Sequence, residues 1–305
     1  EKLGEGSGGV VYLAYHKRLQ KEVVLKQIKS KGLSMADKRQ EVDILKNLNH
    51  SFLPQVLDFL TMGDEVYTVM SYIPGKSLSR LQREGAVFNL GQLTRWGMQI
   101  CSALNYLHSQ KPPVIHGDIK PSNIMLTPQG NICLIDFNIS FFLDENAVLG
   151  YTDGYTSPEQ YIIALDSSSD RPIGNYRKID EKSDIYSVGA TFYHLATGKK
   201  MRNYRDQIDY EDLAGRTSEA FAQIIAKAVE KDPNRRFQSA FEMFQAFQNV
   251  GKKDARYQAL LRRQTGMRIA LAVCMAGFIV LGGIGIHTIR VERTQRSEEH
   301  TSELQ

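Results

Sequence analysis

The most informative segment of this sequence is His116-Gly117-Asp118-Ile119-Lys120-Pro121-Ser122-Asn123, followed after an apolar run by Asp136-Phe137-Asn138. Asp118 and Asp136 lie 18 positions apart, and Asn123 comes five positions after Asp118. Phosphoryl transfer from ATP needs such a set, because one carboxylate orients the attacking hydroxyl while an Asp and an Asn hold magnesium. The two segments in this order therefore favour an enzyme that uses ATP.

These segments resemble the catalytic loop H-R-D-L-K-P-x-N and the metal-binding D-F-G of protein kinases. The resemblance covers residues 1–249 and points to the bacterial Hanks-type serine/threonine kinases. It implies an α+β protein with the bilobal protein-kinase fold, in which a β-rich N-lobe spans residues 1–72 and a mainly helical C-lobe spans residues 73–249. It also implies a non-specific serine/threonine protein kinase whose partners are ATP and proteins with Ser or Thr hydroxyls.

A glycine-rich segment at the start of the chain fits the kinase pattern G-x-G-x-x-G-x-V. It places Gly4, Gly6, Gly9 and Val11 at the ATP site. Without Cβ atoms the backbone lies against the phosphates, and its N–H groups face the anion. The residues after the glycines, 10–15, are rich in β-formers rather than helix formers, which favours a hairpin over ATP rather than a dinucleotide fold.

By the same resemblance, Lys26 contacts the α- and β-phosphates of ATP, and Glu41 in the helical run 38–45 is its ion-pair partner. On their own, these residues would be interpreted as a strand-edge lysine and a solvated helix glutamate. The accompanying motifs favour the functional interpretation.

The resemblance assigns the catalytic roles within the loop. Asp118 orients the substrate hydroxyl, and Lys120 stabilises charge on the transferred phosphoryl group. Asn123 and Asp136 are the expected ligands of Mg²⁺, with Mn²⁺ as an alternative. Thr152 lies at the position where serine/threonine kinases resemble one another in carrying a threonine, and its hydroxyl is expected to reach Asp118 and Lys120.

The adenine site and the framework are also assigned by resemblance. Adenine is expected at the backbone of Ser71 and Ile73, after a gatekeeper at Met70. A stacked spine is expected from Leu45, Val56, His116 and Phe137. Three structural contributions are expected downstream, from Glu159 in a motif like A-P-E, from Asp184 bracing the catalytic loop, and from Arg236 as the partner of Glu159.

The sequence departs from the family pattern at Gly117, where many kinases have arginine, and at Asn138, which replaces the glycine of D-F-G. The absence of the arginine at Gly117 puts activation-loop switching in doubt. The two departures together motivate a second hypothesis, a membrane-tethered pseudokinase that acts as a nucleotide- or protein-binding scaffold. A third hypothesis, a small-molecule kinase, is disfavoured by the peptide platform expected over residues 152–159. Residues 166–175 are predicted to be a polar loop.

Composition agrees with two lobes and a large core, since the 305 residues are 42% hydrophobic. The net charge of +4 does not suggest nucleic-acid binding. The cysteines, Cys101, Cys133 and Cys274, are scattered and indicate neither disulfides nor a zinc site. Cys133 is expected in the core, and a homodimer is left open.

Residues 269–289 contain no Asp, Glu, Lys or Arg and would span about 31 Å as a helix, enough to cross the lipid bilayer. The alternative, a buried core helix, is disfavoured because the kinase fold is already complete by Val250. The basic linker over residues 250–268 places the kinase in the cytoplasm as a single-pass protein of the cell membrane.

Both ends of the sequence look incomplete. The N-lobe is expected to be truncated at its start, because Glu1 lies just ahead of the glycine-rich segment. Within the tail, residues 290–305, the last part from 296 to 305 resembles the translation of a sequencing adapter. A natural polar tail is the alternative.

Overall fold

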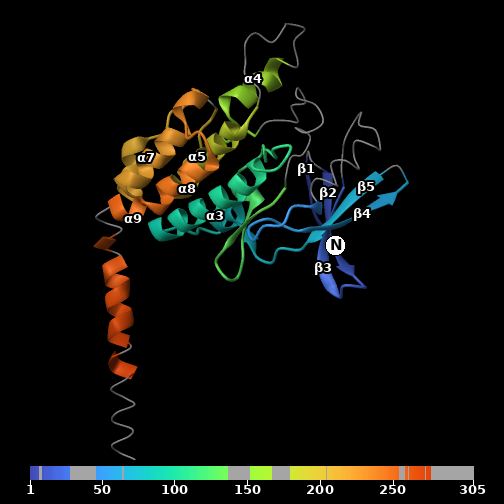
Figure 1. The fold of residues 1–305 in the computed structure, drawn as a ribbon, viewed down its shortest axis with the longest axis horizontal. Coiled ribbons are helices and arrows are strands. Elements are labelled where there is room, and N and C mark those ends of the chain that lie inside the picture. The colour runs from blue at the N-terminus through green and yellow to red at the C-terminus, as the bar shows by residue number, and fades with distance from the viewer. Residues whose placement is uncertain are drawn as a thin grey trace, which may run out of the picture. The chain divides into compact units, whose positions relative to one another are not determined.

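The computed structural model describes residues 1–6, 9–27, 46–63, 65–136, 152–166, 179–203, 205–253, 258–259, 261–271 and 273–275. The chain divides into two compact units, Glu1–Asp254 and Ala255–Gln305. The first unit has the predicted two lobes, a β-rich part followed by a helical part (Figure 1). It extends past residue 249 because the side chain of Val250 is only 1% exposed.

The N-terminal lobe is a five-stranded antiparallel sheet of order β1-β2-β3-β5-β4. Its strands are β1 (Lys2–Gly6), β2 (Gly9–His16), β3 (Lys21–Gln27), β4 (Val56–Met62) and β5 (Glu65–Ser71). β-branched side chains are buried in this sheet, since Val23, Val66 and Val69 are at most 2% exposed. β1 and β2 pair in antiparallel fashion with Gly6 opposite Gly9, so the hairpin predicted at the glycines is confirmed.

A small second sheet carries the two diagnostic segments. It joins β6 (Lys76–Ser77), β7 (Ile124–Leu126) and β8 (Ile132–Leu134), with the 3-10 turn η1 (Pro121–Asn123) just before β7. The loop 116–123 therefore enters this sheet, and Asp136 follows its last strand. Leu134 donates its N–H to the carbonyl of Phe52 at 2.9 Å, which ties the sheet to the segment before β4.

The C-terminal lobe is helical (Figure 1). Its elements are α2 (Leu78–Arg83), α3 (Leu90–His108), α4 (Pro158–Asp166), α5 (Glu181–Thr197), α6 (Tyr210–Arg216), α7 (Glu219–Ala228), η3 (Pro233–Arg235), α8 (Ala240–Gln248) and α9 (Val250–Lys253). The rings of Phe192, Phe221 and Phe247 meet in its core. Gly97 allows α3 to approach them, because a Cβ there would lie 2.7 Å from the ring of Phe247. Cys133 is buried in the core, as predicted.

Several predictions fall outside the described residues. They concern Glu41, Leu45, Phe137, Asn138, nearly all of the polar loop and the whole tail. In the second unit, residues 261–271 are helical. Among the described residues no helix is long and apolar enough to cross a membrane, and residues 276–289 of the predicted span are not among them.

Candidate active site

Asp184, a fully buried residue of α5, anchors the catalytic loop. Its carboxylate accepts the N–H of His116 at 2.9 Å and the N–H of Gly117 at 2.8 Å. The prediction that Asp184 braces this loop is confirmed. Gly117 has φ 76°, in the left-handed region where glycine is not strained, so the departure at this position fits the backbone.

Asp184 stays ionised despite its burial. Burial alone would raise its pKa, but the hydrogen bond and charge of His108 and the N–H of Gly117 together lower it. His108, at the end of α3, lies 2.9 Å from the carboxylate through Nε2. The sequence interpretation missed His108, because its partner lies 76 positions away and no local pattern marks it.

His116 is placed as a neutral ring. Its Nε2 lies 3.1 Å from the carbonyl of Ile135, which only accepts, and its Nδ1 accepts the N–H of Asp118 at 3.3 Å. Burial lowers the pKa of His116, which favours the same neutral form. The ring thereby links the catalytic loop to the residue just before Asp136.

Three predicted residues meet at the carboxylate of Asp118. Lys120 Nζ lies 2.7 Å from Oδ2, and the amide of Asn123 donates to the same oxygen at 3.0 Å. The hydroxyl of Thr152 donates to Oδ1 at 3.0 Å and accepts from Lys120 at 3.0 Å. Because a carboxylate has about four acceptor positions, these three donors from the described residues leave one on Oδ1. Asp118 and Lys120 side chains are 28% and 22% exposed, so a substrate can reach them.

Asn123 and Asp136 fit the metal role by their chemistry. The amide nitrogen of Asn123 is occupied by the carbonyl and the carboxylate of Asp118. Its Oδ1 accepts the hydroxyl of Ser122 at 3.2 Å and has a second lone pair with which to face a cation. Asp136 offers a carboxylate that is 39% exposed. Two protein oxygens completed by phosphate and water are a usual set for Mg²⁺. No cluster of three or more His, Cys, Asp or Glu in the described part of the chain offers a metal site made by protein alone.

Lys26 on β3 lies 3.3 Å from Asp136, so the structure joins the expected phosphate-binding and metal-binding residues directly. Its expected partner Glu41 is outside the described residues. Asp136 has φ 63°, which is uncommon for a residue with a side chain and costs energy that the surroundings must supply.

The glycine-rich hairpin lies beside Lys26. Val11 is the register partner of Lys26, so their side chains share one face of the sheet. Gly4 pairs with Val11 across β1 and β2, and Gly6 pairs with Gly9 at the hairpin end. Gly9 has φ 128°, and a Cβ there would clash with the carbonyl of Gln27, so this position requires glycine.

The residues expected around adenine follow β5. Met70 is 9% exposed and pairs with Val56, which is 4% exposed. Ser71 donates its N–H to the carbonyl of Gln55 at 2.8 Å. If adenine binds the backbone of Ser71, the contact is therefore expected at the carbonyl oxygen. Ile73 lies two residues beyond the end of β5 and is partly exposed.

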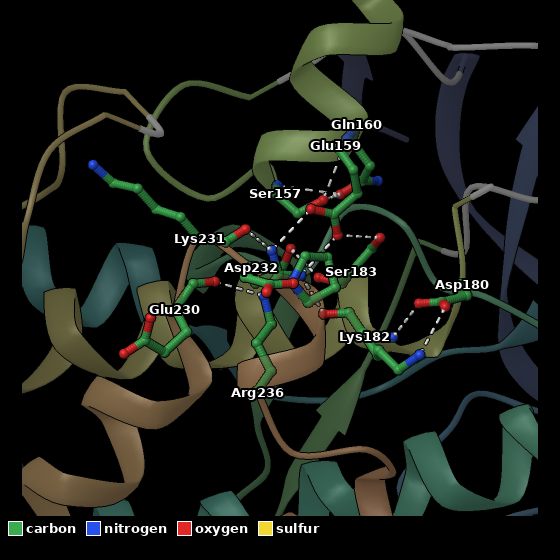
Figure 2. A network of polar contacts seen from close by, with 12 residues as sticks. Ser157, Glu159, Gln160, Asp180, Lys182, Ser183, Glu230, Lys231, Asp232 and Arg236 are labelled. Atoms are coloured by element: carbon green, nitrogen blue, oxygen red, sulfur yellow. Dashed lines mark hydrogen bonds and ion pairs between the residues drawn. The ribbon is translucent and has the colours of Figure 1, made fainter. Parts of the chain in front are cut away.

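A buried ion pair holds the far end of the segment that begins at Thr152. The two terminal nitrogens of Arg236 donate to the two carboxylate oxygens of Glu159 at 2.7 and 2.8 Å, which confirms the predicted pair. Figure 2 shows the network around these two residues. The remaining Arg236 donors are taken by the carbonyls of Lys182, Glu230 and Lys231. Burial would raise the pKa of Glu159, but the hydrogen bonds and charge of Arg236 lower it.

Gln160 is a second residue that the sequence interpretation missed. Its side chain is buried near Ser157 (Figure 2) and donates to the carbonyl of Gly117 at 3.1 Å. The spacing Ser157-x-x-Gln160, with Pro158 between, is that of a helix capping box and would have predicted its contact with Ser157. Nothing in the sequence marks its second partner, a backbone carbonyl.

Comparison with known proteins agrees with this geometry. The family model described as "Protein kinase domain" matches residues 1–248. PknG of Mycobacterium leprae, a serine/threonine-protein kinase, is 33% identical over 253 residues, covering 79% of this chain and 31% of that protein. The serine/threonine-protein kinase Pkn3 of Myxococcus xanthus is 30% identical over 303 residues, covering 88% of this chain and 52% of that protein. The chain thus spans about a third to a half of these curated relatives.

The fold is shared with solved structures. The kinase domain of Mycobacterium tuberculosis PknI matches with a TM-score of 0.61 and 22% identity, covering 82% of this chain and 94% of that one. At this identity the likeness supports the two-lobed fold alone.

Proposed function

The chain belongs to the protein kinase domain family, among relatives named serine/threonine kinases, and we propose that it transfers the γ-phosphoryl group of Mg-ATP to Ser and Thr hydroxyls of proteins. The observation that carries the proposal is the network at Asp118, in which three donors hold the carboxylate and one acceptor position remains. A substrate hydroxyl that donates to this position would be oriented for in-line attack.

The remaining roles follow from the same geometry. Lys120 and Lys26 are the two cations that face the reaction from opposite lobes, and they would balance charge on the phosphates. Asn123 Oδ1 and Asp136 would hold Mg²⁺, which when bound neutralises charge on the phosphate oxygens. The hairpin at Gly4, Gly6 and Gly9 would cover the phosphates, with Val11 beside them.

The test is transfer of labelled phosphate from Mg-ATP to dephosphorylated casein by the full chain. Asp118→Asn removes the carboxylate charge while keeping its shape, and it should lower turnover by at least about a hundredfold. Glu211→Gln, at an exposed position of α6, is the matched control and should leave turnover unchanged. Wild-type turnover no faster than that of Asp118→Asn would reject the kinase in favour of the pseudokinase.

We further propose that residues 269–289 cross the cell membrane and that the kinase domain lies in the cytoplasm. The composition of this segment and the basic linker before it support the proposal. In addition, the apolar side chains of Ile269, Leu271 and Val273 are 59–66% exposed within their unit, so that unit does not bury them. A reporter fused after Arg293 should lie outside the cytoplasm. A protease-protection experiment that finds both flanks of residues 269–289 in the cytoplasm would reject a spanning helix.

A further inference from the structure

Gln160 is the buried residue that connects the catalytic loop to the segment beginning at Thr152. It sits in the first turn of α4 and is 3% exposed. Its Oε1 accepts the hydroxyl of Ser157 at 2.9 Å and the N–H of Ser157 at 3.3 Å. Its Nε2 donates to the carbonyl of Gly117 at 3.1 Å. One side chain therefore bonds to both segments.

A capping box explains only half of these contacts. In that motif the side chain of the third helical residue accepts the backbone N–H of the capping residue, as Oε1 does here with Ser157. The capping hydroxyl accepts in return, and Ser157 Oγ lies 3.4 Å from the N–H of Gln160. The bond from Nε2 to Gly117 lies outside the motif, and glutamate, which caps equally well, could not make it.

The position of Gly117 makes this extra bond consequential. Gly117 directly precedes Asp118, and its N–H is already held by Asp184. With its carbonyl held by Gln160, both hydrogen-bonding groups of this left-handed residue are fixed. The direction in which the chain enters Asp118 is therefore set jointly by α5 and α4.

A second set of contacts between the two segments is made by groups that take part in the chemistry. Thr152 meets Asp118 and Lys120, and all three are partly exposed. The bond from Gln160 to Gly117 instead joins a buried side chain to a partly buried backbone carbonyl that takes no part in the chemistry. Because neither group is needed by the substrate, this bond can hold the two segments at a fixed distance while Asp118 changes partners.

We propose that Gln160 is a positioning residue that sets the distance between Asp118 and the segment on which the protein substrate lies. This inference rests on the proposed kinase function. It requires that loss of the Nε2 bond impairs use of the protein substrate and not of ATP, since Lys26 and Asp136 make no contact with Gln160 in the described structure.

The experiment compares Gln160→Glu, Gln160→Met and Ser157→Ala in the full chain, with casein and Mg-ATP varied separately. Rates are normalised to folded protein by titration with a non-hydrolysable ATP analogue. Gln160→Glu keeps the capping box but loses the donor, and Gln160→Met loses both without burying a charge. Both should lower kcat/KM for casein by roughly 10- to 100-fold, as misplaced reacting groups do, with the KM for ATP unchanged.

Ser157→Ala gives the opposite pattern, because it weakens the cap and keeps the donor to Gly117. It should lower the Tm while leaving kcat/KM for casein within about threefold of wild type. Gln248→Met, at an exposed position of α8, controls for the substitution itself. If the two Gln160 variants lower the Tm but keep wild-type kcat/KM per folded molecule, Gln160 is only a capping residue. If the wild type itself transfers no phosphate, the proposed function fails and this proposal fails with it.

Discussion

The segment from Thr152 to Glu159 is held in different ways at its two ends. At Thr152 the hydroxyl shares partners with Asp118 and Lys120, whose side chains are 28% and 22% exposed. At Glu159 both carboxylate oxygens bind Arg236, and these side chains are 8% and 0% exposed. Both ends of the segment are held by contacts to charged side chains, so the ends differ in how far these side chains are exposed to solvent.

The two ends also differ in how many hydrogen-bonding positions are still open to a ligand. All five donors of Arg236 are matched, and the Glu159 carboxylate also accepts the hydroxyl of Ser183 at 2.7 Å, so this buried arginine offers no free donor to another ligand. Asp118 keeps an acceptor position and is reached by solvent. A complete, buried network resists exchange, while an incomplete, exposed one can accept a substrate. We infer that the Glu159 end contributes stability and the Thr152 end contributes chemistry.

The variant with the largest expected effect is Arg236→Met, which tests whether the Glu159 end contributes stability. It leaves Glu159 buried without its cation, and loss of one partner of a buried pair costs about 3–5 kcal/mol of unfolding free energy. Chemical denaturation at neutral pH measures it. Arg216→Met is the control, because Arg216 is 53% exposed and solvent screens its i,i+4 pair with Asp212, so its loss should change stability little. Equal losses in the two variants would contradict the comparison.

The pH dependence of the same variant checks the cause. The folded state lowers the pKa of Glu159, so in the wild type this group contributes stability above its unfolded pKa of about 4.3 and loses it as pH falls through the folded value. In Arg236→Met, protonation relieves the unpaired charge instead. The stability gap between wild type and variant should therefore narrow as the pH falls, first above about pH 4.3 as the variant's buried carboxyl is protonated, and further below it as the wild type loses its contribution.

The second effect is on activity. Lys26→Met should lower phosphoryl transfer by about 10²–10³-fold, because it removes a cation facing the phosphates. Unfolding free energy should change little, since Lys26 is partly exposed and its pair with Asp136 is 3.3 Å long. Lys21→Met, an exposed position on the same strand, should have normal activity. Near-normal turnover in Lys26→Met would mean that another cation holds the phosphates.

How far the sequence predicts this site depends on what each residue bonds to. Arg236 and Glu159, and Asp118 with Thr152, are side chains in motifs, so resemblance was enough to pair them. Gln160 bonds to the carbonyl of Gly117, and a backbone carbonyl leaves no mark on the sequence. His108 has a motif residue as its partner but is itself an ordinary helix-terminal histidine.

The fold shows the same limit. The strand after the glycines was predicted because β-branched residues favour a half-buried sheet, and it forms β2. The contact between Lys26 and Asp136 was not predicted, since each was assigned to a different partner. Such contacts depend on how β3 and the loop after β8 are placed relative to each other, which local patterns do not encode.

Thr152→Ala should have an intermediate effect and sharpens the chemical end of the comparison. It should lower turnover by roughly 10- to 100-fold, about 1.4–2.7 kcal/mol, because the hydroxyl bridging Asp118 and Lys120 is lost. Thr152→Ser keeps that hydroxyl and should retain most activity. Phosphoamino-acid analysis of the products should find phosphoserine and phosphothreonine. Full activity in Thr152→Ala would show that the exposed contact is dispensable.

The smallest effect concerns Gly117, which lies between the two kinds of network. Its φ of 76° costs a residue with a Cβ about 1–2 kcal/mol, so Gly117→Ala should lower the unfolding free energy by that amount. Gly215→Ala is the opposite case, because Gly215 lies within α6 with open space around it, and alanine there should be neutral or stabilising by up to about 1 kcal/mol. Both hydrogen-bonding groups of residue 117 belong to the backbone, so Gly117→Ala should keep its bonds to Asp184 and Gln160 and lose less than about tenfold in turnover. A loss of activity as large as that of Lys26→Met, without the loss of stability, would instead mean that the glycine serves the reaction directly rather than the turn that carries Asp118.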